Sequence, residues 1–275
     1  PQGTVGAMTV AEKLRGIAEN GRVKAVVLRI DSPGGDAFAS EKIRREVQAL
    51  REAGKRIVVS MGDVAASGGY WIAMGAEEVW ASPATITGSI GVYGLLPTFE
   101  EPLARLGVHT DGVGTTKLAG KMRLDRTMDP ELKRVFQHAT DRTYEDFVEL
   151  VANARGLDTD DVLEVAQGRV WSGSQALGHG LVDSTGTLQD AIDAAARLAG
   201  LGSDYEVRFD EWELSPFESM LYEMMGATMV RMGLDVSSRT ALSSGLAGRL
   251  LTELERIAGA NEGFTVAAHC LCGPE

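Results

Sequence analysis

The hydrophobic positions of the first 130 residues fall into short runs of two alternating kinds. Residues 23–30 and 56–60 are mostly apolar and rich in β-branched side chains, which is typical of buried strands. Residues 9–19 and 39–53 instead have apolar positions at helical spacing. Strand, helix and strand in this order predict a parallel crossover. We therefore expect an α/β domain whose parallel sheet is covered by helices on both faces.

The same patterns predict the elements that follow. Helices are expected at residues 65–76, 96–106, 129–155 and 159–166, and strands at residues 78–81, 90–93 and 109–113. Shorter segments follow at residues 169–171, 174–179 and 188–198. The helix at 129–155 has an apolar stripe that indicates a core or an interface. Its members are Leu132, Val135, Phe136, Ala139, Tyr144, Phe147 and Val151.

The last part of the chain differs in character. Residues 202–275 are rich in Met and Ser, and five methionines have the spacing of one helical face, namely Met220, Met224, Met225, Met229 and Met232. Such stripes mark packing more often than a cofactor site. We interpret residues 1–200 as the main domain and residues 201–275 as a helical appendage with a tail. Cys270 and Cys272 beside His269 are too few for a closed metal site, so we expect no metal and no other cofactor.

Composition excludes several classes of protein. The chain of 275 residues has 39 acidic and 27 basic side chains, for a formal net charge of −12. An acidic surface without a basic stripe repels phosphate, so we expect no nucleic-acid partner. No stretch approaches the roughly 20 apolar residues of a membrane-spanning helix. Because the chain starts without an initiator Met or a signal peptide, we expect a processed or truncated product.

Three segments of small residues follow predicted strands. Residues 31–35, Asp-Ser-Pro-Gly-Gly, come after the strand at 23–30, and glycine amides at a strand's carboxyl end can bind a ligand or an oxyanion. A tight turn is the alternative. Residues 60–71 follow the strand that is predicted to end at Ser60, and Ser67 with Gly68 and Gly69 opens a helix. This position suits a nucleophile, but it equally suits an N-cap serine followed by close packing.

The third segment, residues 83–92, has hydroxyl groups at Thr85, Thr87 and Ser89, and it too has a simple turn as its alternative. The carboxyl ends of parallel strands open toward the same edge of a sheet. One shared site is therefore more probable than three unrelated turns.

A base for Ser67 is not obvious among the histidines. His109, His138, His179 and His269 occur in contexts that share no pattern. A lysine kept neutral by burial can activate a serine instead. Lys117 is the candidate because it lies in an otherwise uncharged stretch, residues 115–120, and Lys121 is the nearest rival. A solvated surface lysine is the alternative for both.

Four motifs together carry a family resemblance. They are SPGG at 32–35, DVAASGGYWIA at 63–73, ATITGSIGV at 84–92 and the run from GRVWSG to GLVD at 168–183. In this order they resemble the signal peptide peptidase A family, serine peptidase family S49, over roughly residues 5–200. The resemblance implies a ClpP/crotonase-like fold and a Ser/Lys dyad that cleaves remnant signal peptides. The tail AHCLCG also resembles the end of the long, two-domain bacterial form, whose C-terminal half this chain would be.

The resemblance implies a role for several residues. Ser67 matches the nucleophile and Ser89 the serine that helps to orient the lysine, while the amides of Gly35 and Gly68 would form the oxyanion hole. Gly34 and Tyr70 are expected to bind substrate, in an apolar groove to which Trp71 and Met74 could also contribute. In short family members the general base is a lysine at or near the place of Lys117. In the long form it comes from the N-terminal half, so both sources stay open here.

The resemblance also implies partners and a location. We expect signal peptides and other apolar peptides as substrates, a homo-oligomeric ring, and attachment to the bacterial inner membrane through an absent N-terminal anchor, with the catalytic domain facing the periplasm. Two alternatives remain. A crotonase-type acyl-CoA enzyme would need carboxylates as acid and base together with an adenine-pyrophosphate site. A non-self-sufficient assembly half would depend on a lysine from a missing domain.

Overall fold

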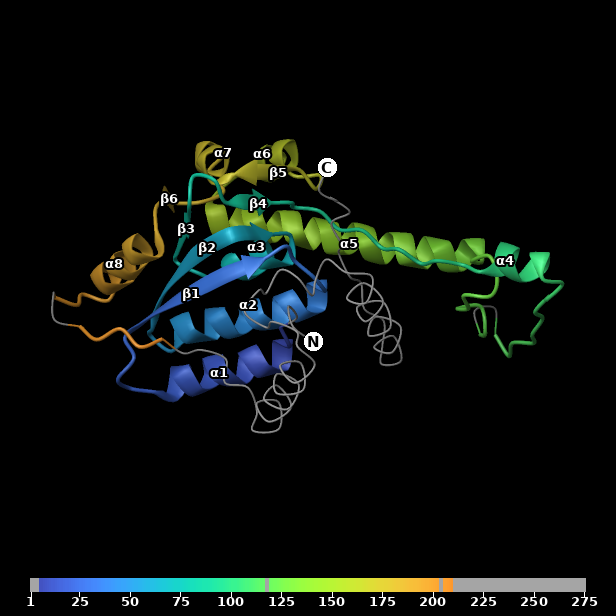
Figure 1. Ribbon diagram of the computed structural model, residues 1–275, viewed down its shortest axis with the longest axis horizontal. Coiled ribbons are helices and arrows are strands. Elements are labelled where there is room, and N and C mark those ends of the chain that lie inside the picture. Colours follow the sequence, from blue (N-terminus) through green and yellow to red (C-terminus); the bar gives the residue numbers. More distant parts are fainter. Residues whose placement is uncertain (1–4, 117–118, 203–204, 210–275) are drawn as a thin grey trace, which may run out of the picture. The chain divides into compact units, whose positions relative to one another are not determined.

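The structure is a computed structural model that describes residues 5–116, 119–202 and 205–209 (Figure 1). The helices are α1 (Ala7–Glu19), α2 (Ala37–Glu52), α3 (Gly68–Ala73), α4 (Glu100–Arg105), α5 (Pro130–Arg155), α6 (Thr159–Val165), α7 (Gly173–Gly178) and α8 (Leu188–Leu198). The strands are β1 (Ala25–Ser32), β2 (Arg56–Ala66), β3 (Glu78–Ala81), β4 (Ile86–Gly88), β5 (Val170–Ser172) and β6 (Ser184–Thr185).

Strand β2 lies at the centre of the sheet. It pairs with β1 along one edge, while on its other edge β3 pairs with its first half and β4 with its second half. These pairings and that of β3 with β6 are parallel, whereas β4 and β5 are antiparallel. The central position explains why residues 57–59 are fully buried, as a continuous apolar run predicts.

Helices pack against both faces of β1 and β2. Ile57 belongs to a core cluster with α1 and α2, whereas the next residue, Val58, packs with alanines of α8. Successive side chains of a strand point to opposite faces, so these two contacts define two helical layers on either side of the sheet. Figure 1 shows α1 and α2 together on one side of β1. The predicted α/β class with a covered sheet is confirmed.

The register brings three strand ends together. Ser32 of β1 is paired with Ala65 of β2, and Ala66 of β2 is paired with Gly88 of β4. Parallel strands in this register end side by side, at the edge of the sheet where α/β proteins bind ligands. The three segments of small residues therefore leave the sheet at neighbouring points.

Several predicted boundaries are wrong. Strand β2 does not end at Ser60 but continues to Ala66, because its second half still has β1 and β4 as partners. Consequently the helix predicted at 65–76 is confined to α3. The strand predicted at 90–93 is absent, and β4 lies just before it, since the backbone turns at Gly88 and Ser89, which both have positive φ.

The region between β4 and α5 contains further differences. The helix predicted at 96–106 begins only at Glu100, as α4, and residues 109–113 form no strand. A strand needs a partner for its backbone groups, and in the described residues none pairs with this segment. Val113 at the end of this segment is fully exposed, as expected for a segment that belongs to no sheet.

Helix α5 confirms the long helix predicted at 129–155. The Asp129 side chain caps it by accepting a hydrogen bond from the Glu131 amide, and it ends at Gly156 in the left-handed conformation. Its apolar stripe divides in two. Phe147 and Val151 near the end of the helix are buried in the main core, whereas Val135 near its start is half exposed.

The predicted appendage at 201–275 lies mostly outside the described residues, so its boundary stays a prediction. In the described part of the chain, no helix combines the length and the apolar character that a bilayer requires.

Candidate active site

Ser67 is the single residue between β2 and α3, and its backbone is strained. Its φ of 50° and ψ of −118° lie in a region that side-chain-bearing residues rarely adopt. The amide of Ser67 donates to the Gly88 carbonyl at 2.9 Å, and its own carbonyl accepts from the Trp71 amide at 2.8 Å. The side chain makes no capping hydrogen bond to α3. Ser67 therefore occupies the N-cap position of α3, but its hydroxyl group does not cap the helix.

The loop after β1 packs against Ser67 from one side. A Cβ added at Gly34 would lie 2.7 Å from the Ser67 Cβ, and one at Gly68 would lie 3.1 Å from the Gly35 nitrogen. The two glycines proposed for the oxyanion hole, Gly35 and Gly68, are thus neighbours. Within the part of the chain that the structure describes, no hydrogen bond has either of their amides as its donor. Both amides can bind an oxygen atom.

The segment after β4 forms the opposite side. Ser89 has a φ of 52° and donates its amide to the Arg169 carbonyl at 2.8 Å. It follows Gly88, whose carbonyl receives the Ser67 amide, so Ser89 lies in the neighbourhood that the resemblance implies. Its proposed role in orienting a lysine stays a prediction.

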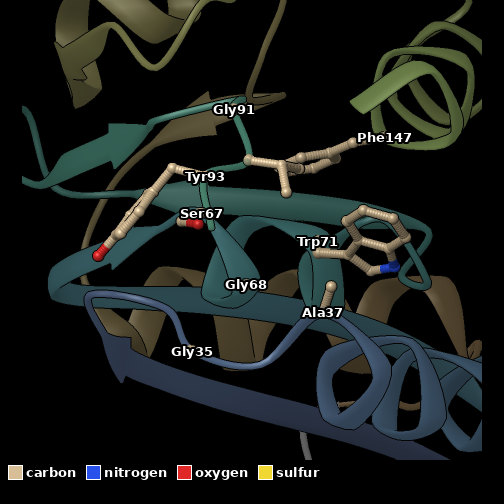
Figure 2. A pocket seen from close by; sticks show the side chains of 9 residues that line it. Gly35, Ala37, Ser67, Gly68, Trp71, Gly91, Tyr93 and Phe147 are labelled. Atoms are coloured by element: carbon tan, nitrogen blue, oxygen red, sulfur yellow. The ribbon is translucent and has the colours of Figure 1, made fainter. Parts of the chain in front are cut away.

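All three segments contribute to one pocket (Figure 2). Its lining residues are Gly35, Ala37, Ser67, Gly68, Trp71, Gly91, Val92, Tyr93 and Phe147. Figure 2 shows Ser67 and Tyr93 on one side of the pocket, and Trp71 and Phe147 on the other. The walls are mainly glycine, aliphatic and aromatic groups, which suit an apolar chain next to the serine hydroxyl.

Trp71 is held in the pocket wall by two contacts. Its ring centroid lies 4.6 Å from that of Phe147, and its indole N–H donates to Glu41 Oε2 at 2.8 Å. Burial raises the pKa of Glu41, but hydrogen bonds from Arg44, Trp71 and Arg45 prevail and lower it to about 2. The carboxylate behind the pocket is therefore charged at neutral pH.

Two predicted substrate-binding residues do not line the pocket. Tyr70 is fully buried in the main core, its hydroxyl donates to the Leu181 carbonyl at 2.7 Å, and burial raises the pKa of the phenol. Gly34 lies behind Ser67 rather than on the pocket surface. Met74 is also a core residue, so of the apolar groove residues predicted near Ser67 the structure places Trp71 alone at the pocket.

The candidate bases for Ser67 are two lysines and the histidines. Lys117 lies outside the described residues. Its rival Lys121 forms an ion pair with Asp129 at 2.6 Å. The described histidines do not line the pocket: His109 and His138 are exposed, and His179 packs on the Trp171 ring.

Comparison with known proteins identifies the family. Residues 49–202, which include Ser67, α5 and most of the pocket, match Peptidase family S49. The chain belongs to peptidase family S49. It is 40% identical over 272 residues to Protease 4 of Salmonella typhi, a match that covers 98% of this chain and 43% of that protein. The chain therefore spans less than half the length of this curated relative.

Other relatives of this S49 chain come from distant organisms. Serine protease SPPA, chloroplastic, of Arabidopsis thaliana is 38% identical over 216 residues, with 77% of this chain and 32% of that protein covered. A putative signal peptide peptidase SppA of Enterococcus faecium is 35% identical over 182 residues, with 66% and 53% covered. Among solved structures, a ClpP1 mutant from Listeria monocytogenes matches with a TM-score of 0.48 and 16% identity, covering 68% of this chain and 86% of that chain. This distant similarity concerns the backbone alone.

The S49 pocket contains residues that the sequence patterns did not single out. Gly91, Val92 and Tyr93 lie where a strand was expected, and Phe147 belongs to a stripe that was interpreted only as core or interface. For these three residues the signal was available, because Gly91 and Val92 belong to the third small-residue segment and Tyr93 directly follows it. For Phe147 no sequence signal was available, because it reaches the pocket from α5 through packing on Trp71.

Proposed function

We propose that this S49 member is the catalytic part of a serine endopeptidase with Ser67 as its nucleophile. The observation that carries the proposal is the strained Ser67, whose hydroxyl makes no capping hydrogen bond and borders the pocket beside the amides of Gly35 and Gly68. A strained residue in a one-residue turn between strand and helix presents its side chain outward, as nucleophiles require. The family membership supports the same assignment.

The proposed reaction follows from this geometry. A neutral base removes the Ser67 hydroxyl proton while Oγ attacks the carbonyl carbon of a peptide bond. The carbonyl oxygen becomes an oxyanion, which the amides of Gly35 and Gly68 stabilise by hydrogen bonds. The protonated base gives its proton to the leaving amine, and a water molecule then hydrolyses the acyl-enzyme and restores Ser67.

We propose a lysine as the base, because none of the described histidines lines the pocket. Lys117 stays the candidate within this chain, and a lysine from a further domain or a neighbouring subunit is the alternative. Replacement of Lys117 by alanine should abolish peptide cleavage with folding unchanged. Cleavage that survives this change would place the base elsewhere.

The proposed substrates are apolar peptides, among them remnant signal peptides. The pocket walls formed by Trp71, Val92 and Phe147 support this choice, as does the similarity to a putative signal peptide peptidase SppA of Enterococcus faecium. We also propose that the protein acts at the bacterial inner membrane, on its periplasmic side, and that it assembles into a ring. Large apolar side chains on the surface, such as Leu95 at 80% and Leu106 at 78% exposure, support an interaction with other chains.

A crotonase-type acyl-CoA enzyme is less well supported. That chemistry needs carboxylates beside the substrate, and among the described residues that line the pocket none is acidic. Glu41 lies behind Trp71, where four hydrogen bonds occupy its oxygens.

An active-site fluorophosphonate tests the proposal, because such a probe reacts with activated serines. The full chain should become covalently labelled, Ser67→Ala should lose the label, and the matched exposed-serine variant Ser174→Ala should keep it. Absence of labelling in the intact assembly, with any further domain that supplies the base, or labelling that persists in Ser67→Ala, would refute Ser67 as the nucleophile.

A further inference from the structure

Glu41 connects helix α2 to the pocket wall without touching the pocket. Its carboxylate accepts from the Trp71 indole at 2.8 Å, from Arg44 at 2.7 and 3.0 Å, and from Arg45 at 2.7 Å. Both oxygens are therefore occupied, and the side chain is only 24% exposed. A carboxylate with this many donors has one well-defined position.

Trp71 is the side chain through which Glu41 can act. The indole is 7% exposed and packs on Phe147, so its plane is fixed by the ring contact on one side and by the Glu41 hydrogen bond on the other. Tryptophan N–H groups that are buried need an acceptor. If the acceptor is removed, the indole must turn its N–H toward another acceptor or toward water, and its face no longer borders the pocket in the same way.

We propose that Glu41 is a positioning residue that sets which side chain the pocket accepts by holding the Trp71 indole in the apolar wall. The inference rests on the proposed peptidase function, since selectivity is measured on peptide cleavage. Ser67, Gly35 and Gly68 belong to the other parts of the pocket, so the chemical step itself does not depend on Glu41.

The test compares two peptide substrates that differ only in the residue before the cleaved bond, leucine in one and alanine in the other. Glu41→Ala should lower kcat/KM for the leucine peptide about 10-fold, mainly through a higher KM, because a mispositioned wall loses apolar contact with the larger side chain. The alanine peptide should be affected much less. Glu41→Gln should restore most of the selectivity, because its amide oxygen can still accept from the indole.

Two further variants exclude a merely structural effect. Glu46→Ala removes a carboxylate of the same helix that is ion-paired with Arg15, away from Trp71, and should leave the selectivity unchanged. In a Trp71→Phe background, which lacks the indole N–H, Glu41→Ala should have no further effect on the ratio of the two kcat/KM values.

The outcomes separate this inference from the proposed function. If the wild-type protein in its intact assembly is not labelled by the fluorophosphonate, the assignment of Ser67 as the nucleophile fails. If labelling and cleavage are intact but Glu41→Ala affects both peptides equally or neither, the role of Glu41 is refuted. Should Glu41→Ala fail to fold, Glu41→Gln decides: a normal Trp71 indole N–H resonance with retained leucine preference supports the proposal, and a displaced resonance with unchanged preference overturns it.

Discussion

The loop that contains Gly34 packs closely against Ser67, and a substitution there tests whether this contact positions Ser67. Gly34 has a φ of 120°, where a residue with a side chain is strained. A Cβ placed there would lie 2.7 Å from the Ser67 Cβ, 2.9 Å from the Gly68 nitrogen and 3.1 Å from the Ala66 carbonyl oxygen. Two of these three atoms belong to the backbone, so the clash cannot be relieved by a rotating side chain.

The expected cost of Gly34→Ala has two parts. Backbone strain accounts for about 1–3 kcal/mol, and overpacking against Ser67 adds a similar amount, about 1–3 kcal/mol. Since Ser67 and Gly68 must shift to make room, the hydroxyl and one of the two amides leave their positions together. A displacement of about 1 Å at a reacting group costs roughly 100-fold in rate.

The assay measures the rate of fluorophosphonate labelling and the thermal midpoint of the same samples. Gly34→Ala should label about 100-fold more slowly and unfold at a lower temperature than wild type. Gly54→Ala is the matched control, because Gly54 has a φ of 81° but open space around its Cβ. It should lower the stability by about 1 kcal/mol and leave labelling unchanged. Wild-type labelling by Gly34→Ala would refute the idea that this close contact positions Ser67.

Three further predictions concern stability and pH. Tyr70→Phe leaves the buried Leu181 carbonyl without its donor and should cost about 1–3 kcal/mol in chemical denaturation, with peptide cleavage retained; a loss of cleavage in the folded variant would return Tyr70 to the substrate site. Asp183→Ala leaves the Arg155 guanidinium, whose side chain is 9% exposed, without its carboxylate. Because Asp183 itself is partly exposed, we expect a loss of about 2–3 kcal/mol rather than the full cost of a buried pair; an unchanged midpoint would contradict this. Glu41 has its pKa lowered from 4.5 to about 2, so its stabilising contribution is complete above pH 4.5 and is lost as the pH falls toward 2. Glu41→Gln should make the stability depend less on pH between 4.5 and 2. If both proteins lose stability in the same way over this range, the carboxylate does not contribute.

The order of elements could be predicted where one period dominates the sequence. The run at 23–30 and the amphipathic stretches at 39–53 and 129–155 became β1, α2 and α5 with boundaries close to those expected. Elements of small residues could not be predicted in this way. The second half of β2 contains Gly62, Ala65 and Ala66, whose extended conformation depends on pairing with β1 and β4 rather than on local preference.

The backbone arrangement of the site could be predicted from the sequence, whereas the side-chain contacts that form the pocket walls could not. Strand ends in a parallel sheet converge, so the grouping of Gly35, Ser67 and Gly68 follows from topology. Whether Ser67 was a cap could not be decided from the sequence, because both roles place a serine at the start of a helix; the φ of 50° and the absence of a capping bond decide it. The contact of Trp71 with Phe147 joins distant segments, and no periodic pattern contains that information.

The contacts of Lys121 help to choose between the candidate general bases for Ser67. A general base must accept a proton, so a lysine in this role has to be neutral when substrate binds. Lys121 instead donates to Asp129 at 2.6 Å, and that hydrogen bond, with one from the Glu131 amide, lowers the pKa of Asp129. The same carboxylate caps the start of α5, the helix that carries Phe147 to the pocket wall, so the ion pair with Lys121 belongs to the structure of that helix. For the proposed peptidase reaction we therefore expect the base to be Lys117 or a lysine from outside this chain rather than Lys121.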